Sequence, residues 1–516
     1  MGACGHGVVT PTVRVLVANR GEIAVRIIRA CRELGYSTVA VYSNSDRMAP
    51  HVRYADQAVS LGADVPEDSY LHIPKLIDAA RRTGADTVHP GYGFLAENAE
   101  FASACGDAGL RFVGPPPEVI DLMGGKTAAR QAAKKAGVPV VPGTESPIDP
   151  SLTDADVLTI AEAVGFPLFV KAVAGGGGKG MRLVEDSSTL AGAIRAARSE
   201  AQGAFGNSAI YLERSVNPAR HIEVQILADG EGQVVPFVER ECSVQRRHQK
   251  VIEETPSPAV TTEIRRSLAS AARALAEGVG YVNAGTVEFL LDADGRFYFL
   301  EMNTRLQVEH PITEMVTGVD IVHWQLRIAA GERLTLDRER ALEPNGHAVE
   351  CRIYAEDPES GFMPSPGRIT RLRRPSGPGI RDDSGVDEGF EVSVFYDSMI
   401  SKLVAWAPDR HQAIQRMVRA LGEYHIEGVK TTLPFFLWML RQPEFLEGRV
   451  DTGFLDRLLA VSDSVMSVGA SAELEEQAVL AAAVHTFLAG QRSAERSSQS
   501  EDTGAWRRAA RFEGLR

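Results

Sequence analysis

The sequence has no long apolar run, few cysteines and no excess of positive charge. No stretch approaches the ~18 to 20 apolar residues of a membrane-spanning helix, and residues 1–12 lack the pattern of a secretory signal peptide. The five cysteines form no C-x-x-C pair, so neither a disulfide framework nor a zinc cluster is expected. A net charge of −13 argues against general nucleic-acid binding. We therefore expect a cytoplasmic protein with reduced thiols.

The length predicts more than one domain. A chain of 516 residues exceeds what one hydrophobic core usually serves, so two or three domains are expected. Hydrophobic residues make up 44% and charged residues 24% of the chain, which is typical of a folded globular protein and leaves little room for bulk disorder. No internal repeat is visible.

The N-terminal part alternates strand and helix patterns. Residues 13–18 are apolar like a buried strand, apolar residues then recur at helical spacing between Ile23 and Leu34, and residues 37–42 predict the next strand. A second unit of this kind includes the helical pattern of residues 73–83. We expect a doubly wound α/β domain with a parallel sheet up to about residue 125. Its first turn lacks G-x-G-x-x-G, so no dinucleotide site is expected there.

A glycine-rich hairpin follows from about residue 140. Residues 166–172 and 181–184 are strand-like and flank the run of glycines at 175–178, and a helix is predicted over 190–201. Glycine backbone N–H groups can close over phosphates, which favours a mobile lid, although a plain flexible turn would have the same pattern. Lys171 and Lys126 could supply cations to this loop, or each could be a solvated surface lysine.

Two carboxylates and an amide cluster further along, in a body of alternating strands that indicates an α+β region. Glu288 lies in an apolar strand, where an unpaired carboxylate is costly; Glu301 ends the next apolar strand, and Asn303 follows it. If the two strands pair as a hairpin, both carboxylates can point to the same side. Oxygen donors of this kind suit Mg²⁺. The alternative is a pair of surface carboxylates on an edge strand.

Residues with anion-binding chemistry lie on both sides of this cluster. Arg305, Gln307 and Glu309 alternate, so on an extended backbone their side chains would face one way and could hold and deprotonate a planar anion. The alternative is a structural ion pair between Arg305 and Glu309. The segment 242–250 predicts an anion or nucleotide pocket, unless it is a solvated basic face; its donors are Gln245, Arg246, Arg247, His248 and Lys250.

Six motifs in order, together with these features, resemble the biotin carboxylases, which are ATP-grasp ligases. The motifs are residues 18–24, 89–95, 175–181, 241–250, 301–311 and 362–367. The resemblance covers residues 13 to about 455. It implies an N-terminal α/β (pre-ATP-grasp) domain over 13–125, an ATP-grasp domain over 126–330 with a lid at about 141–215, and a C-terminal biotin-carboxylase-type domain over 331–460. Residues 461–516 are expected to form a helix, a polar linker and a basic tail.

The resemblance also implies a role for individual residues. ATP phosphates would be held by Lys126, Lys171, Gly175, Gly176, Gly177, Gly178 and His248, and the adenine and ribose by Glu213, Val216, His221 and Gln245. Mg²⁺ or Mn²⁺, usually two ions, would be bound by Glu288, Glu301 and Asn303. Bicarbonate would be held by Lys250, Arg305, Gln307 and Val308, with Glu309 as the general base. Arg352 would steady the enolate-like oxygen of biotin.

The implied activity is ATP-dependent carboxylation of biotin by bicarbonate through carboxyphosphate, as the first half-reaction of an acyl-CoA carboxylase built from several subunits. The biotin-attachment signature Ala/Val-Met-Lys-Met does not occur in the sequence, so biotin is expected on a carrier protein or on a domain missing from this chain. A carboxyltransferase and a homodimer are the other expected partners. The alternatives are a two-subunit pyruvate or 2-oxo acid carboxylase, another ATP-grasp ligase that forms an acyl or carbamoyl phosphate, and a non-catalytic scaffold.

Overall fold

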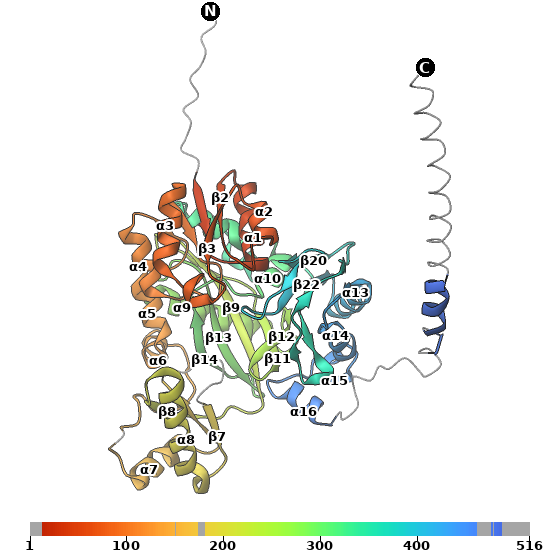
Figure 1. Cartoon of the computed structure of the whole chain (residues 1–516). Helices are drawn as coiled ribbons and strands as arrows, with labels where there is room; N and C mark the ends of the chain where they lie inside the picture. The colour runs from red at the N-terminus through yellow and green to blue at the C-terminus, as the bar shows by residue number, and fades with distance from the viewer. Residues whose placement is uncertain (1–12, 150, 174–180, 462–475, 478, 488–516) are drawn as a thin grey trace, which may run out of the picture. The chain divides into compact units, whose positions relative to one another are not determined.

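The computed structural model describes residues 13–149, 151–173, 181–461, 476–477 and 479–487 (Figure 1). The first five strands form one parallel sheet in the order β3-β2-β1-β4-β5. The strands are β1 (Arg14–Val17), β2 (Ser37–Ser43), β3 (Gln57–Gly62), β4 (Thr87–His89) and β5 (Arg111–Phe112). The helices of this region are α1 (Gly21–Glu33), α2 (Pro50–Tyr54), α3 (Ile73–Thr83), α4 (Ala99–Asp107) and α5 (Pro117–Gly124). The predicted doubly wound α/β fold is confirmed.

Alternation along β1 explains why helices cover both faces of this sheet. Val15 and Val17 pack with Ile27 of α1 and with Trp324 of α11 (Ile321–Ala329). Leu16 points the other way and packs in a second cluster with residues of α3 and α4. The turn between β1 and α1 is thereby held at the carboxyl end of a buried strand, where it can face a ligand.

A smaller three-stranded sheet lies in the region where the sequence predicts a lid; this region, gold in Figure 1, is called the lid below. Its antiparallel strands β6 (Leu168–Ala172), β7 (Met181–Val184) and β8 (Ile210–Arg214) have the order β7-β6-β8. Helices α7 (Asp154–Val164) and α8 (Ser187–Phe205) pack on it around a separate apolar core that includes Leu168 and Leu212. The predicted return strand at 181–184 is confirmed; the glycines 175–178 lie outside the described residues. Helix α6 (Lys126–Lys135) precedes the lid.

The largest sheet has nine strands, which pair antiparallel in the order β14-β13-β9-β11-β12-β15-β22-β20, with β10 beside β9. The strands are β9 (Ala219–Ala228), β10 (Val234–Pro236), β11 (Arg240–Arg246), β12 (Gln249–Thr255), β13 (Asn283–Asp292), β14 (Phe297–Asn303), β15 (His347–Tyr354), β20 (Ile380–Ser384) and β22 (Met399–Ala407). Because β12 pairs with β15, one sheet joins segments that the sequence analysis assigned to two domains.

The two faces of this sheet differ in polarity. Ile222 and Val224 of β9 pack with Leu268 and Leu275 of α9 (Thr262–Gly278), which closes the apolar face. Glu223, between them, points to the opposite face, which is polar and carries the candidate site. Helix α10 (His310–Thr317) follows β14 along the chain.

Shorter elements complete the chain as far as residue 461. They are the strands β16 (Glu356–Asp357), β17 (Met363–Pro364), β18 (Gly367–Arg368), β19 (Arg371–Arg373), β21 (Glu391–Val392) and β23 (His425–Glu427), and the helices α12 (Arg338–Ala341), α13 (Arg410–Glu423), α14 (Leu433–Met439), α15 (Pro443–Leu446) and α16 (Phe454–Val461), with 3₁₀ turns at Pro66–Asp68 and Pro358–Ser360.

The chain divides into two units, residues 1–460 and 461–516. In the second unit the described residues 476–477 and 479–487 are helical, in agreement with the helix that the sequence predicts there, and Val479, Val484 and Phe487 are exposed. The predicted polar linker and basic tail lie outside the described residues. None of the helices in the described ranges is both long and apolar enough to cross a lipid bilayer.

Candidate active site

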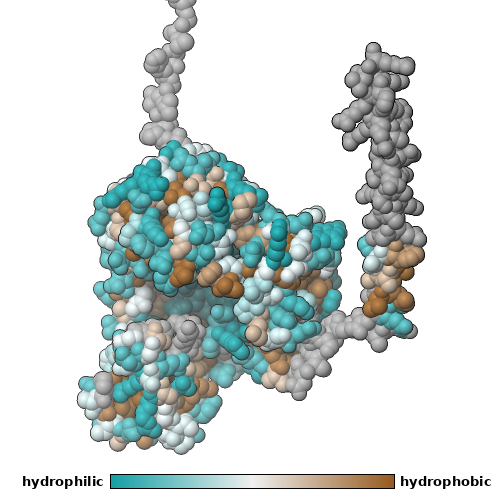
Figure 2. All heavy atoms as spheres, viewed as in Figure 1, coloured by the Kyte–Doolittle hydropathy of each residue, from teal (hydrophilic) through white to brown (hydrophobic). Residues whose placement is uncertain are grey.

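A cleft of about 950 Å³ collects most of the residues singled out by the sequence; Figure 2 shows the hollow between the lid and the rest of the first unit. Its lining includes Lys126, Lys171, Glu213, Val216, His221, Gln245, His248, Lys250, Glu288, Glu301, Asn303, Arg305, Gln307, Val308 and Arg352. Glu309 is fully buried and does not line it. Asn19 and Arg20, in the turn after β1, also line the cleft, so the parallel sheet, the lid and the large sheet all contribute residues to it.

The predicted carboxylate hairpin is present. In the pairing of β13 with β14, Glu288 lies directly opposite Glu301, and cross-strand neighbours point to the same side of a sheet. Glu288 accepts hydrogen bonds from Lys250 Nζ (2.8 Å), Asn303 Nδ2 (2.8 Å) and Gln307 Nε2 (3.0 Å). The alternative of surface carboxylates on an edge strand is wrong for Glu288, which is buried.

The two carboxylates differ in their surroundings. Burial would raise the pKa of Glu288, but the charges of Lys250 and His221 outweigh it and lower that pKa; His221 Nε2 lies 2.9 Å from Glu288 Oε2. Glu301 is open to the cleft and accepts no hydrogen bond from the described residues. Reduced hydration in the cleft and the neighbouring charge of Glu288 raise the pKa of Glu301. Glu288, Glu301 and Asn303 thus line one space, and carboxylate and amide oxygens are a donor set that fits Mg²⁺.

Lys250 ties the carboxylates together. Its Nζ donates to Glu288 (2.8 Å) and Glu309 (2.7 Å) and also contacts Glu223. Burial would lower the pKa of Lys250, but the charges of these carboxylates outweigh it and hold that pKa well above its ordinary value. Lys250 is therefore a fixed cation at the cleft wall.

Glu309 lies just behind that wall. Besides Lys250 it accepts a hydrogen bond from Arg352 Nη2 at 3.1 Å. Burial would raise the pKa of Glu309, but Lys250 and Arg352 outweigh it and place that pKa well below its ordinary value. Glu309 is therefore ionised near neutral pH, which is the form that a general base needs.

The expectation of an extended backbone from Arg305 to Glu309 is wrong. Residues 304–309 form no strand, and Glu309 is the N-cap of α10 with φ −82° and ψ 12°. The reason is Pro311 in the first turn of α10, where proline starts a helix readily. The side chains converge nevertheless, since Arg305 Nη1 donates to Gln307 Oε1 at 2.9 Å.

The alternative of an ion pair between Arg305 and Glu309 is also wrong. Arg305 Nε instead donates to Glu97 at 2.9 Å, and its Nη2 donates to Asn303 Oδ1 at 2.9 Å. Arg305 is thus held between the N-terminal domain and β14. Its guanidinium faces the cleft from a position set by two separate parts of the fold.

Cations and amides line the rest of the cleft. Lys171 contacts Glu213, which also accepts a hydrogen bond from Arg130 at 2.7 Å, so the Glu213 carboxylate is already paired. Burial lowers the pKa of Lys126 at the start of α6. Gln245 Nε2 lies 3.0 Å from His221 Nδ1, next to Glu288. His248, with φ 64°, is exposed in the turn between β11 and β12.

The sequence analysis missed several charged residues that position this site. They are Glu97, Arg130, Glu223, Arg240 and Glu253. Glu223 lies between Ile222 and Val224, so the reasoning about costly buried carboxylates that singled out Glu288 could have found it. Glu253 lies in a strand of mostly polar residues and lacks that signal. No comparable signal marks Glu97, because its partner lies 208 residues away in the chain.

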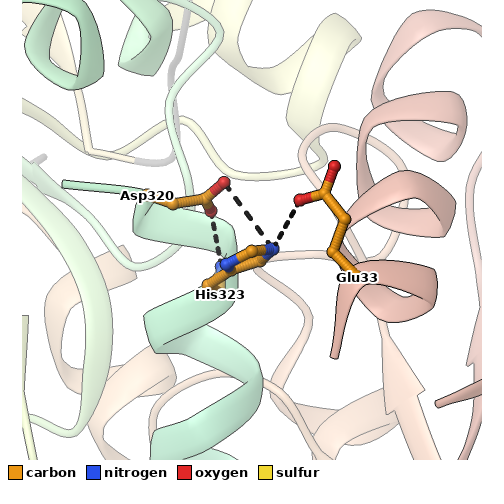
Figure 3. Close-up of side chains that lie close together, drawn as sticks. All are labelled: Glu33, Asp320 and His323. Atoms are coloured by element: carbon orange, nitrogen blue, oxygen red, sulfur yellow. Dashed lines mark hydrogen bonds and ion pairs between the residues drawn. The ribbon is translucent and has the colours of Figure 1, made fainter. Parts of the chain in front are cut away.

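A second cluster of acidic and histidine side chains lies outside the cleft (Figure 3). His323 Nε2 is 3.0 Å from Glu33 Oε2 and 3.8 Å from Asp320 Oδ2, and the Asp320 side chain caps α11. Arg26 also pairs with Asp320, at 2.7 Å. This cluster joins the end of α1 to the start of α11, and we interpret it as an ion-pair network.

Three family models match the chain. The biotin carboxylase N-terminal domain matches residues 11–120, the ATP-binding domain of the carbamoyl-phosphate synthase L chain matches 125–337, and the biotin carboxylase C-terminal domain matches 350–457. A biotin carboxylase of Nostoc sp. is 50% identical over 445 residues, which are 86% of this chain and 99% of the relative. A pyruvate carboxylase subunit from Methanothermobacter thermautotrophicus is 50% identical over 88% of this chain and 91% of its own.

Solved structures agree with these matches. A biotin carboxylase complex from Campylobacter jejuni has a TM-score of 0.83 at 44% identity, over 86% of this chain and 98% of its own. The biotin carboxylase domain dimer of the Hydrogenobacter thermophilus 2-oxoglutarate carboxylase has a TM-score of 0.83 at 46% identity, over 87% of this chain and 98% of its own. The chain therefore belongs to the biotin carboxylase family and is an ATP-dependent ligase with an ATP-grasp domain.

Proposed function

We propose that this chain uses ATP and bicarbonate to carboxylate biotin on a separate carrier protein, as the first half-reaction of an acyl-CoA carboxylase built from several subunits. One observation supports it most: a single cleft brings together a carboxylate pair, fixed cations and Arg352. The relatives from C. jejuni and H. thermophilus are described as complexes with an ATP compound and with MgADP and bicarbonate, respectively. We propose that this chain binds the same ligands.

ATP lies between the lid and the large sheet in this proposal. Lys126, Lys171 and His248 hold the phosphates together with the glycines 175–178, and the adenine and ribose lie near Glu213, Val216, His221 and Gln245. The pairing of Glu213 with Lys171 and Arg130 supports a role in keeping the lid strands in register beside the nucleotide. The corresponding domains are 13–125, 126–330 and 331–460.

Glu288, Glu301 and Asn303 hold Mg²⁺, and two ions are expected. A divalent ion bound there would neutralise charge on the transferring phosphoryl group. The chain's own residues prepare the site: Lys250 and His221 keep Glu288 ionised, and Glu301 is open to the cleft. A metal bound there would meet one carboxylate that the chain keeps ionised and one that is open to the cleft.

Bicarbonate is held by Lys250, Arg305, Gln307 and Val308 in this proposal. Ionised Glu309 accepts the bicarbonate proton, so that a bicarbonate oxygen can attack the terminal phosphorus of ATP with release of ADP. Carboxyphosphate then breaks down to CO₂ and inorganic phosphate beside biotin. The biotin ureido N–H gives its proton to that phosphate, Arg352 stabilises the negative charge that develops on the ureido oxygen, and the nitrogen attacks CO₂ to form carboxybiotin. Closure of the lid protects the water-labile carboxyphosphate.

The carboxyl acceptor distinguishes two versions of this function. We favour an acyl-CoA, with a biotin carrier protein and a carboxyltransferase as partners and a homodimer of this chain. The second version is a carboxylase of pyruvate or another 2-oxo acid, which is favoured by the names of the M. thermautotrophicus and H. thermophilus relatives. Pull-down of the full-length chain followed by carboxylation assays with acetyl-CoA, propionyl-CoA, pyruvate and 2-oxoglutarate distinguishes them.

The central experiment replaces Glu309 by glutamine. We expect Glu309→Gln to bind ATP as the wild type does but to lose bicarbonate-dependent ADP release by roughly 100-fold or more, because a positioned base contributes 10²–10⁴-fold. Equilibrium nucleotide binding and a coupled ADP assay measure the two effects. Turnover at the wild-type rate would remove Glu309 from the role of base.

Stimulation of ATP hydrolysis by free biotin separates this function from that of other ATP-grasp ligases. Those ligases would show no stimulation by biotin.

A further inference from the structure

Glu253, on β12, is a buried carboxylate in contact with the one arginine expected to touch biotin. Its side chain is fully buried, and its Oε1 accepts a hydrogen bond from Arg352 Nε at 2.6 Å. β12 and β15 pair with Glu253 opposite Glu350, so Arg352 is a diagonal neighbour of Glu253 on the same face of the sheet. The contact thus follows from the register of two adjacent strands.

The Arg352 guanidinium is shared between two carboxylates. Its Nε donates to Glu253, and its Nη2 donates to Glu309 at 3.1 Å. Both carboxylates are fully buried and neither lines the cleft, whereas Arg352 does. The part of the guanidinium that reaches the cleft is therefore the part that these carboxylates leave uncovered. The Tyr354 side chain is a further hydrogen-bond partner of Arg352.

Stability alone gives a poor account of Glu253. Its second oxygen, Oε2, is buried and accepts no hydrogen bond from the described residues. A buried carboxylate with an unpaired oxygen costs free energy, and a buried ion pair is weak evidence for a gain in stability. Burial raises the pKa of Glu253 to about 7 despite the opposing charge of Arg352, so the charged form is disfavoured at this position.

We propose that Glu253 is a positioning residue that holds the Arg352 guanidinium in the orientation needed to contact the biotin oxygen. Glu253 acts through Arg352 and touches neither substrate. The inference rests on the proposed function, because it takes the role of Arg352 from there. Without Glu253, Glu309 would be the sole carboxylate in direct contact with the guanidinium among the described residues, and Arg352 would turn toward it and away from the cleft.

Glu254, the next residue on β12, offers a matched control. It is also buried and ion-paired, with His347 Nε2 at 2.7 Å and Arg410 Nε at 2.7 Å, but it points to the opposite face of the strand. It does not line the cleft. Loss of either carboxylate removes a buried ion pair from the same strand, and only loss of Glu253 releases Arg352.

The test compares Glu253→Gln and Glu254→Gln in the full-length chain, with free biotin as the carboxyl acceptor. We expect Glu253→Gln to lower kcat/KM for biotin about tenfold or more, as for loss of a charged hydrogen bond, and to leave the KM for ATP within about twofold. Glu254→Gln should lower the thermal midpoint and keep both kinetic constants. Equal kinetic losses in the two variants, or no loss in Glu253→Gln, would overturn the proposal.

A double-mutant cycle distinguishes failure of this inference from failure of the proposed function. In an Arg352→Ala background, Glu253→Gln should change kcat/KM for biotin by less than about twofold, because its route to the substrate is gone. If Arg352→Ala itself leaves the biotin kinetics unchanged, the role proposed for Arg352 fails. If Arg352→Ala is impaired and Glu253→Gln is equally harmful with and without Arg352, only the positioning role fails.

Glu253→Asp keeps the test decisive if the glutamine variant does not fold. It retains the charge and withdraws the carboxylate from Arg352 Nε. A selective loss in kcat/KM for biotin, smaller than that of Arg352→Ala, is expected. Biotin kinetics equal to those of the wild type would contradict the proposal.

Discussion

The pair His221–Glu288 in the cleft and the pair His323–Glu33 on the surface have the same chemistry and nearly the same length, 2.9 Å and 3.0 Å. They differ in burial: the Glu288 side chain is 4% exposed and that of Glu33 is 63% exposed. Water screens the surface pair and competes for its hydrogen bonds, whereas the buried charges interact in a medium of low polarity. Distance between two groups therefore says little about their effect until burial is known.

The number of partners differs as well. Glu288 accepts three hydrogen bonds from Lys250, Asn303 and Gln307 in addition to its contact with His221. Glu33 pairs only with His323 among the described residues. A carboxylate held from several sides has one orientation, which a metal site requires, and an exposed carboxylate with one partner does not.

The largest difference between the two glutamates is expected when the charge of each is removed. Glu288→Gln should lower Mg²⁺-dependent ATP turnover roughly 100-fold or more, because metal-mediated charge stabilisation is worth several kcal/mol. Glu33→Gln is the control, and its turnover should stay within about twofold of the wild type. A coupled ADP assay across a Mg²⁺ titration measures both. Similar turnover in the two variants would show that burial does not separate the clusters.

The contacts of Glu254 with His347 and Arg410 are a buried ion-pair cluster that has no part in the proposed chemistry. Burial would raise the pKa of Glu254, but the hydrogen bond from His347 and the charge of Arg410 outweigh it and lower that pKa to about 2. The unfolded chain therefore takes up this proton first as pH falls. The stabilisation by Glu254 is complete above pH 4.5 and is lost between 4.5 and about 2, up to about 3 kcal/mol.

Thermal midpoints of the wild type and Glu254→Gln at several pH values measure this effect. The advantage of the wild type should be constant near neutral pH and should shrink as the pH falls below about 4.5. An advantage that is independent of pH down to the acid limit of folding would mean that the Glu254 charge does not stabilise the folded state.

The smallest effect is expected from the surface cluster. Glu33→Gln should lower the free energy of unfolding by at most about 1 kcal/mol, and added salt should reduce the difference, because exposed ion pairs are screened. Thermal midpoints at low and high salt measure it. A loss as large as that of Glu254→Gln would contradict the distinction between the two regions.

Local patterns in the sequence were sufficient to predict many of the strands and helices and the carboxylate hairpin of the site. The apolar run at residues 13–18 predicted a buried strand, helical spacing predicted α3 with its bounds, and the apolar strands around Glu288 and Glu301 suggested a hairpin that β13 and β14 form. Each of these signals is local in the chain, because side-chain periodicity is a property of the local backbone.

The partners of the charged residues could not be read in this way. Arg305 pairs with Glu97 across 208 residues, Arg352 pairs with Glu309 and Glu253, and Pro311 places Glu309 at a helix start where an extended segment was expected. Nothing near these residues in the chain specifies the contacts. They follow from the packing of the N-terminal domain, α10 and β12 against the large sheet.

Composition, periodicity and ordered motifs were enough to establish the parallel N-terminal sheet, the carboxylate hairpin and the resemblance to biotin carboxylases. Folding in three dimensions added the burial of Glu309, the sharing of Arg352 between two carboxylates and the single sheet that joins β12 to β15. The physical reason is the difference in separation along the chain. Backbone preferences act between neighbouring residues, whereas the environment of a charge depends on every segment that excludes water from it.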